Sequence, residues 1–198
     1  MSVSLLRPEI ILIFLDMDGV LNTPSSQKKW KNKPRHPSIY ARGGDYDDSP
    51  DPEIIVLNPD CVETFKLFLS QLPGEYRIIL SSTWRHAVHW DLNQSTFKNH
   101  GLPEIFSRTV HGVPGIPDQT KWHRGLEIKH WIESNNCKTN PFLVIDDEMF
   151  TIDKYIDKKH LVYVQNGWNS NRGFNDWHRR HGLEKIQKQL GLPVRVFP

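Results

Sequence analysis

The chain has 198 residues, of which 24% are charged, and its formal net charge is +2 at pH 7. This length suits a single α/β domain over residues 1–198, and so slight a positive charge is only weak evidence for an anionic partner. No apolar run approaches the ~20 residues that cross a bilayer, and the two isolated cysteines exclude a disulfide framework. We therefore expect a cytoplasmic protein with two buried thiols and without a membrane segment, a targeting segment or a disulfide-linked partner.

The first predicted element is a strand over residues 10–15, which form a continuous apolar run rich in β-branched residues. Such runs are typical of central parallel strands that are buried on both faces. Residues 23–53 follow as a polar stretch dense in Pro, Gly, Ser and charge, which predicts a long loop or small flap. The flap carries a cluster of basic residues around one aromatic residue, namely Lys28, Lys29, Trp30, Lys31, Lys33 and Arg35.

Helices and strands alternate along the rest of the chain. Asn58 and Pro59 predict the start of a helix, whose apolar residues recur at helical spacing as far as Leu72. The later predicted elements are a strand over 76–80, helices near 90–99 and 121–134, a short strand over 105–110, strands over 142–145 and 161–164, and a helix over 176–190. This alternation predicts a mostly parallel sheet with helices on both faces and a ligand beyond the carboxyl ends of the strands.

Two carboxylates, Asp16 and Asp18, come directly after the first strand. A strand-end carboxylate can attack phosphorus and form an aspartyl-phosphate, and a second one nearby can protonate the leaving oxygen and later activate water. Gly19 lets the backbone turn sharply and approach a phosphate closely. A helix-capping turn is the alternative interpretation, but the apolar strand before the pair favours catalysis.

Hydroxyl groups follow the strand over 76–80. Ser81 and Ser82 can hydrogen-bond a phosphoryl oxygen, and Arg85 can add a bidentate contact to the same group. Serines at strand ends are also common turn residues, so this motif gains its meaning from the others.

Charged residues stand at two further places. Lys121 or Arg124, at the start of a predicted helix, can screen the nucleophile and the phosphate together, although each can also be a solvated charge. Asp146 and Asp147 follow the strand over 142–145, where acids crowded together are costly without a cation. Carboxylate oxygens suit Mg²⁺, so this pair favours a magnesium site over a polar loop.

The order of these motifs resembles the haloacid dehalogenase (HAD) superfamily. The motifs are Phe-Leu-Asp-x-Asp-Gly-Val-Leu-Asn, Ile-Leu-Ser-Ser-Thr-Trp-Arg, a basic residue at a helix start, and Val-Ile-Asp-Asp. Over residues 10–190 the chain is most similar to the HAD domains of Swiss Army Knife RNA repair proteins. The resemblance implies an HAD-like fold, with Asp16 as nucleophile, Asp18 as acid and base, and Ser81 as the phosphate-binding hydroxyl.

The resemblance also implies a cation and a metal site. Lys121 and Arg124 compete for the role of the cation, and we favour Arg124 because Arg-Gly-x-Glu-Ile is typical of this branch. Mg²⁺ is expected on Asp16, the Asp18 carbonyl and Asp146, with Asp147 beside them.

The substrate is predicted from the insertions. Residues 23–53 and 86–120 are too short for a full cap domain, so we expect an open site. We predict a Mg²⁺-dependent phosphomonoesterase acting on a DNA or RNA end or a nucleotide, with Lys29 and Trp30 binding phosphate and base. The alternatives are a small-metabolite or protein phosphatase, a phosphotransferase, a non-catalytic nucleic-acid-binding module and, for the flap, a solvated loop.

Overall fold

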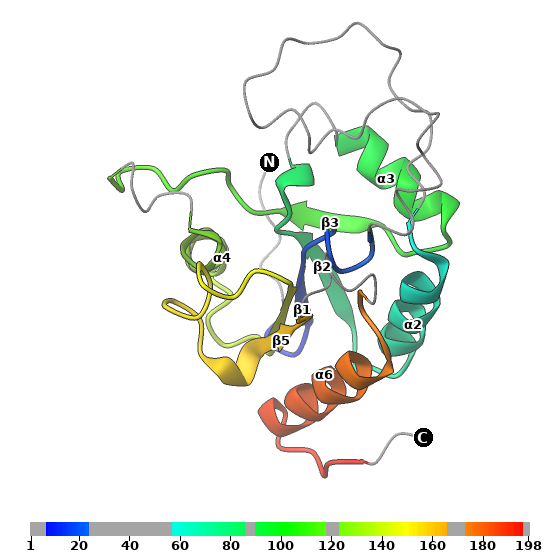
Figure 1. Ribbon diagram of the computed structural model, residues 1–198. Helices are drawn as coiled ribbons and strands as arrows, with labels where there is room; N and C mark the ends of the chain where they lie inside the picture. The colour runs from blue at the N-terminus through cyan, green and yellow to red at the C-terminus, as the bar shows by residue number, and fades with distance from the viewer. Residues whose placement is uncertain (1–6, 24–56, 86–89, 118–122, 166–172, 196–198) are drawn as a thin grey trace, which may run out of the picture.

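The computed structural model describes residues 7–23, 57–85, 90–117, 123–165 and 173–195. In this part of the chain five strands form one parallel sheet in the order β3-β2-β1-β4-β5 (Figure 1). The strands are β1 (Ile11–Leu15), β2 (Tyr76–Leu80), β3 (Ile105–Arg108), β4 (Phe142–Asp146) and β5 (Leu161–Tyr163). The helices are α2 (Pro59–Ser70), α3 (Trp90–Asn99), α4 (Arg124–Ser134) and α6 (Asp176–Gln189), with short 3₁₀ helices η2 (Thr83–Arg85) and η4 (Lys158–His160).

The predicted parallel α/β architecture is therefore confirmed, and local sequence signals explain several of the element ends. The Asn58 side chain caps α2 by accepting a hydrogen bond from the Asp60 N–H at 3.1 Å, as its residue type predicts. The helix predicted near 121–134 begins only at Arg124 among the described residues, and the third strand ends at Arg108. That residues 1–198 form one domain stays a prediction.

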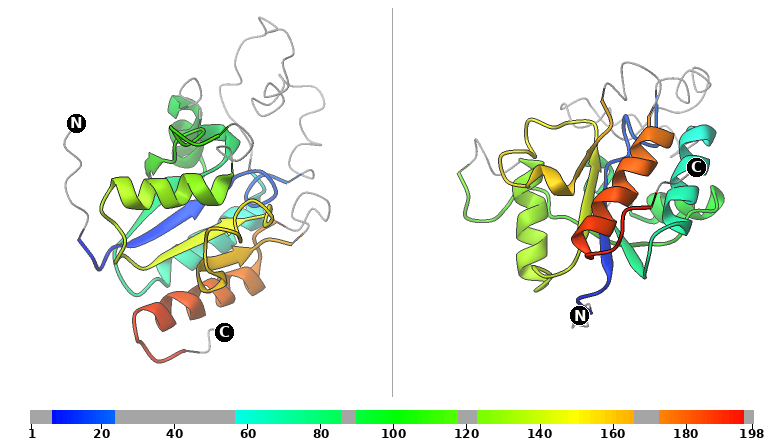
Figure 2. Two further views of the ribbon diagram at one scale, coloured as in Figure 1. Left: turned by 90° about the vertical axis from the view of Figure 1, so that its left-hand side faces the viewer. Right: turned by 90° about the horizontal axis from the view of Figure 1, so that it is seen from below.

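The two faces of the sheet bury separate sets of apolar side chains, because successive residues of a strand point to opposite faces. One face packs against α2 and α6, whose buried side chains include Phe65, Phe68, Leu183 and Ile186. The other face packs against α4, where the Phe14 ring meets Trp131 edge-on with 5.4 Å between ring centroids. Figures 1 and 2 show α4 on one side of the sheet and the pair α2 and α6 on the other. The helices on both faces are thus confirmed as well.

The sheet has its switch point at β1. From this central strand the chain continues through β2 and β3 on one side, and then crosses to β4 and β5 on the other side. Sheets of this kind bind ligands beyond the carboxyl ends of the strands at the switch point. We call the region just beyond the carboxyl ends of β1, β2 and β4 the carboxyl edge.

Two sequence predictions concern membranes and thiols. None of the helices in the described ranges is both long and apolar enough to span a membrane. Cys61 and Cys137 are both buried, in agreement with their interpretation as buried thiols. The cytoplasmic location and the lack of a disulfide-linked partner stay predictions.

Candidate active site at the carboxyl edge

Three carboxylates meet at the carboxyl edge. The ladder between β1 and β4 continues one residue past β1, since the Asp16 N–H donates to the Ile145 carbonyl at 3.0 Å. This register places Asp16 beside the end of β4, so that oxygens of Asp16, Asp146 and Asp147 lie within 4.8 Å of one another. Asp16 and Asp146 are buried. The structure thus brings together two acidic segments that lie 130 residues apart in sequence.

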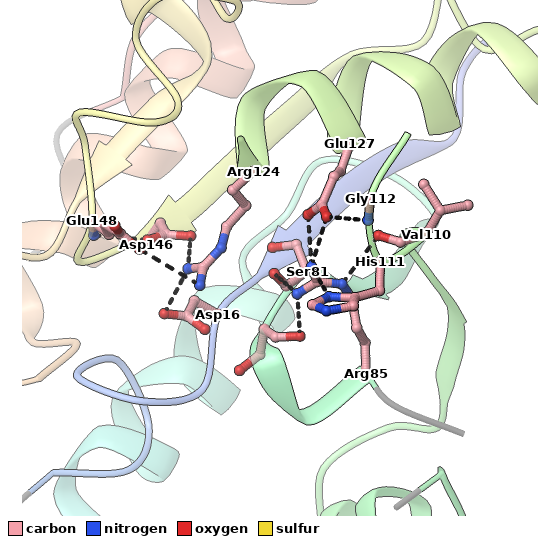
Figure 3. Close-up of polar contacts among 11 residues, drawn as sticks. Asp16, Ser81, Arg85, Val110, His111, Gly112, Arg124, Glu127, Asp146 and Glu148 are labelled. Atoms are coloured by element: carbon pink, nitrogen blue, oxygen red, sulfur yellow. Dashed lines mark hydrogen bonds and ion pairs between the residues drawn. The ribbon is translucent and has the colours of Figure 1, made fainter. Parts of the chain in front are cut away.

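Arg124 is the cation of this cluster (Figure 3). It is the first residue of α4, and its Nη1 lies 2.9 Å from Asp16 Oδ2 and 2.6 Å from Asp146 Oδ2. Burial lowers the pKa of this guanidinium, but Asp146 and Asp16 outweigh the burial and raise that pKa well above its usual value. Lys121, the other candidate from the sequence, lies outside the described residues, as do Lys29 and Trp30.

The cluster holds more negative than positive charge. Burial raises the pKa of Asp146; Arg124 opposes this rise and Asp16 adds to it. Glu148 brings a further carboxylate, whose Oε2 lies 3.9 Å from Arg124 Nη2. One guanidinium therefore faces an excess of carboxylates.

The second carboxylate of the first motif has its own set of contacts. Asp18 is partly exposed, and its Oδ1 accepts a hydrogen bond from Asn22 Nδ2 at 2.7 Å. Its Oδ2 accepts from the Trp84 indole N–H at 3.1 Å, so both oxygens are oriented. Burial, with the neighbouring Asp16, raises the pKa of Asp18 to about 6, against the effect of these hydrogen bonds. A carboxyl group with these properties can exchange a proton near neutral pH.

Gly19 lies in the turn directly after Asp18, against the second acidic segment. Its φ is +75°, and a Cβ at this position would overlap the side chain of Asp147. The sequence predicts a close approach of Gly19 to a phosphate, and the described residues show a close approach to a carboxylate of the acidic cluster. Glycine is required here by both the backbone conformation and the space.

Several buried polar atoms at the carboxyl edge find no hydrogen-bond partner within the described ranges. These atoms are Asp16 Oδ1, Ser81 Oγ and Ser82 Oγ. Ser81 is placed beside Asp16 because the β1–β2 ladder also continues, with the Ser81 N–H donating to the Leu15 carbonyl at 2.9 Å. Buried polar groups are almost always hydrogen-bonded, so these three atoms leave hydrogen-bonding capacity available for a ligand at this edge.

Comparison with known proteins agrees with the sequence motifs. Residues 12–178 match the model of a family described as the HAD domain in Swiss Army Knife RNA repair proteins. The chain belongs to this family. No curated protein and no solved structure matches the chain. The resemblance inferred from the motifs is therefore confirmed, and the family supports a phosphatase or related hydrolase in general terms.

The acidic cluster of this HAD domain suits Mg²⁺. Asp16, Asp146 and Asp147 offer hard carboxylate oxygens, and Asp16 Oδ1 has no partner among the described residues that a cation would have to displace. The carboxylate of Asp18 is not part of this cluster. Its two oxygens accept hydrogen bonds from Asn22 and Trp84.

The contacts of Arg85 differ from those that the sequence predicts. The sequence predicts a bidentate phosphate contact, but each nitrogen of this buried guanidinium already has a protein partner (Figure 3). Nη2 donates to Glu127 Oε1 and Oε2 and lies 3.1 Å from His111 Nδ1, while Nε donates to the Val110 carbonyl. Nη1 donates to the carbonyls of Ser81 and Ser82. A phosphate would find no free N–H on Arg85.

Sequence reasoning missed the residues that hold the predicted site in place. Asn22 and Trp84 lie inside the recognised motifs, but nothing in their spacing shows that both donate to Asp18. The sequence pattern could have identified Glu127, because it is an acidic residue beside Ile128 on the apolar face of α4. A charged residue on such a face indicates a buried partner, which is Arg85.

Proposed function

We propose that this HAD domain is a Mg²⁺-dependent phosphomonoesterase that forms an aspartyl-phosphate on Asp16. The observation that carries the proposal is the surroundings of Asp16 at the carboxyl edge. Its Oδ2 is held by Arg124, its Oδ1 has no partner in the described part of the chain, and the hydroxyl of Ser81 beside it is equally unsatisfied. These neighbours support the roles of nucleophile for Asp16, cation for Arg124 and phosphate-binding donor for Ser81.

In the first half of the proposed reaction, a carboxylate oxygen of Asp16 attacks phosphorus and the bond from phosphorus to the leaving oxygen breaks. Asp18 gives its proton to that oxygen, so the product leaves as an alcohol. The hydrogen bonds from Asn22 and Trp84 keep the Asp18 carboxyl group in one orientation for this transfer. Arg124 and the hydroxyls of Ser81 and Ser82 stabilise the charge on the phosphoryl oxygens.

In the second half, Asp18 accepts a proton from water as the water oxygen attacks the phosphorus of the aspartyl-phosphate. The bond to Asp16 breaks, inorganic phosphate leaves, and both carboxylates return to their starting state. Mg²⁺, when bound by Asp16, Asp146 and Asp147, would neutralise part of the charge of the carboxylates and the phosphate.

For the substrate we propose a phosphorylated nucleic-acid end or a nucleotide. Two observations support this choice: the family that matches the chain is named for RNA repair proteins, and the sequence of residues 23–53 includes Lys29 and Trp30 within a basic cluster. Lysine suits backbone phosphates and tryptophan can stack on a base.

The experiment is a comparison of phosphate release from matched substrates with Mg²⁺ present. RNA and DNA oligonucleotides phosphorylated at the 3′ or the 5′ end are compared with mononucleotides, sugar phosphates and a phosphopeptide. We expect the highest kcat/KM for an oligonucleotide end or a nucleotide. For oligonucleotides, kcat/KM should fall at high salt, and this fall should be smaller in the double variant Lys29→Ala with Trp30→Ala. A preference for sugar phosphates or the phosphopeptide would reject the substrate. Binding of oligonucleotides without any phosphate release would reject the enzyme.

A further inference from the structure

The ion pair between Arg85 and Glu127 is buried at both ends. Their side chains are 5% and 0% exposed, and Arg85 Nη2 lies 2.7 Å from Glu127 Oε2. Burying two charges costs several kcal/mol per ion, and apolar residues of similar size in place of such a pair often leave stability unchanged. Stability alone therefore gives no reason for charges at these two positions.

The pair joins three segments that are distant in sequence. Arg85 Nη1 donates to the carbonyls of Ser81 at 3.2 Å and Ser82 at 2.6 Å, which fixes the backbone after β2. Glu127 Oε1 accepts a hydrogen bond from the Gly112 N–H at 2.8 Å, in the loop after β3. Glu127 itself belongs to α4. We call this set of contacts the Arg85–Glu127 bridge.

The two ends of the bridge lie next to the groups that would bind phosphate. At one end are Ser81 and Ser82, whose buried hydroxyls have no partner among the described residues. At the other end, Glu127 lies three residues after Arg124 on the same helix, so the bridge fixes the helix that brings Arg124 to Asp16. The electrostatic effects agree with this proximity: burial lowers the pKa of Arg85 and raises the pKa of Glu127, and Arg124 adds a smaller lowering effect to each.

We propose that the Arg85–Glu127 bridge is a positioning device, which aligns the hydroxyls of Ser81 and Ser82 with the guanidinium of Arg124 around one phosphoryl group. This inference rests on the proposed phosphatase function. Arg85 and Glu127 are positioning residues, since all of their described contacts are with the protein. The bridge is rigid because Arg85 offers a planar set of donors to acceptors in three segments, which a lysine ammonium group does not match.

The main test replaces the bridge without leaving a charge unpaired. In the double variant Arg85→Met with Glu127→Leu, we expect a folded protein whose kcat falls by roughly 10- to 100-fold, because a misplacement of about 1 Å costs on that order. The shift in Tm caused by Mg²⁺ should stay as in the wild type, since Asp16, Asp146 and Asp147 are unchanged.

Two single variants keep the test decisive if the double variant does not fold. Arg85→Lys keeps the charge opposite Glu127 but loses the contacts to the serine carbonyls, so a lowered kcat in a folded protein supports positioning. Glu127→Gln keeps the shape of the side chain, and we expect it to lower kcat more than it raises KM.

The matched control is Arg179→Met. Arg179 is another buried arginine, 1% exposed, whose Nη2 lies 2.6 Å from Asp176 Oδ1 on α6. We expect this variant to lose stability while the folded fraction keeps its kcat. If the wild type is active and the folded bridge variants have the same kcat, the positioning role is overturned but the proposed function is not. A wild type that releases no phosphate from any phosphomonoester would overturn the proposed function and this inference with it.

Discussion

Arg124 and Arg85 are both buried at the carboxyl edge, yet their surroundings differ. Every nitrogen of Arg85 has a protein acceptor, and the carboxylate that it meets, Glu127, is satisfied in return. Arg124 lies between Asp16 and Asp146, and beside it polar atoms remain without a partner in the described part of the chain. Residue type and burial alone therefore do not distinguish an arginine whose donors are all satisfied within the protein from one beside unsatisfied polar atoms.

The balance of charge differs in the same way. Arg85 pairs with one carboxylate, so the bridge is neutral by itself. Arg124 faces Asp16 and Asp146, with Glu148 and Asp147 nearby, so that its cluster has an excess of negative charge. The first arrangement is complete, while the second is suited to an added cation and a phosphate.

The largest expected effect comes from the nucleophile. Asp16→Asn removes the attacking carboxylate, so we expect phosphate release to fall on the order of 10⁴-fold or more. The fold should persist, as judged by circular dichroism. Asp153→Asn, which changes an exposed acidic residue, is the control and should keep full activity. A near-normal rate in Asp16→Asn would remove the aspartyl-phosphate from the mechanism.

Arg124 should respond differently from Arg85 to substitution. Arg124→Met leaves Asp16 and Asp146 without their cation, which should lower kcat on the order of 10²- to 10³-fold. The loss of one partner of a buried pair should also lower the free energy of unfolding by about 3 kcal/mol without Mg²⁺, measured by urea denaturation. Added Mg²⁺ should recover part of this stability. If Arg124→Met matched the wild type in both measurements, its place in the cluster would have no functional meaning.

Metal binding gives the third comparison. Mg²⁺ should raise the Tm of the wild type, by an amount that corresponds to about 2.7 kcal/mol at a hundred times the Kd. The variant Asp146→Asn should respond much less, because it loses one carboxylate of the cluster. Glu104→Gln, an exposed residue away from the carboxyl edge, serves as the control. Equal responses in all three proteins would place the metal elsewhere.

The smallest expected effect concerns His178 at the start of α6. His178 Nδ1 accepts the hydrogen bond of the Asn175 N–H at 3.1 Å, in a capping box at the start of α6. Burial, with a contribution from His181, lowers the pKa of His178 to about 4. Protonation would abolish the acceptor, so this neutral ring keeps its full contribution above pH 6.5, and stability falls as the pH drops from about 6.5 to about 4.

We expect this loss to be about 2 kcal/mol between pH 7 and pH 4.5, because most of the interval between the unfolded and the folded pKa lies in that range. The measurement is the difference in urea midpoint between pH 7 and pH 4.5, compared between the wild type and His178→Gln. Glutamine can accept the same N–H hydrogen bond without titrating, so its pH response should be weaker. The same pH response in both proteins would exclude His178 as the cause.

The sequence alone determined the elements of this protein and their order. Apolar runs, helical spacing and the Asn58 cap are local signals, so the strands β1, β2 and β4 and the helix α3 were predicted nearly at their observed ends. The alternation of elements then fixed a parallel sheet, and that fold necessarily gathers Asp16, Ser81 and Asp146 at one end of it. The choice of Arg124 from the motif also agrees with its contacts.

Only the tertiary structure decided which polar groups are partners. Arg85 and Glu127 are 42 residues apart, and Asp18 and Trp84 are 66 residues apart, so no local spacing connects them. Whether a guanidinium binds phosphate or a buried carboxylate depends on which segment approaches it, and that is set by the packing of α4 against the sheet. The sequence names the charged groups, but the packing decides which of them are satisfied within the protein and which stay available to a ligand.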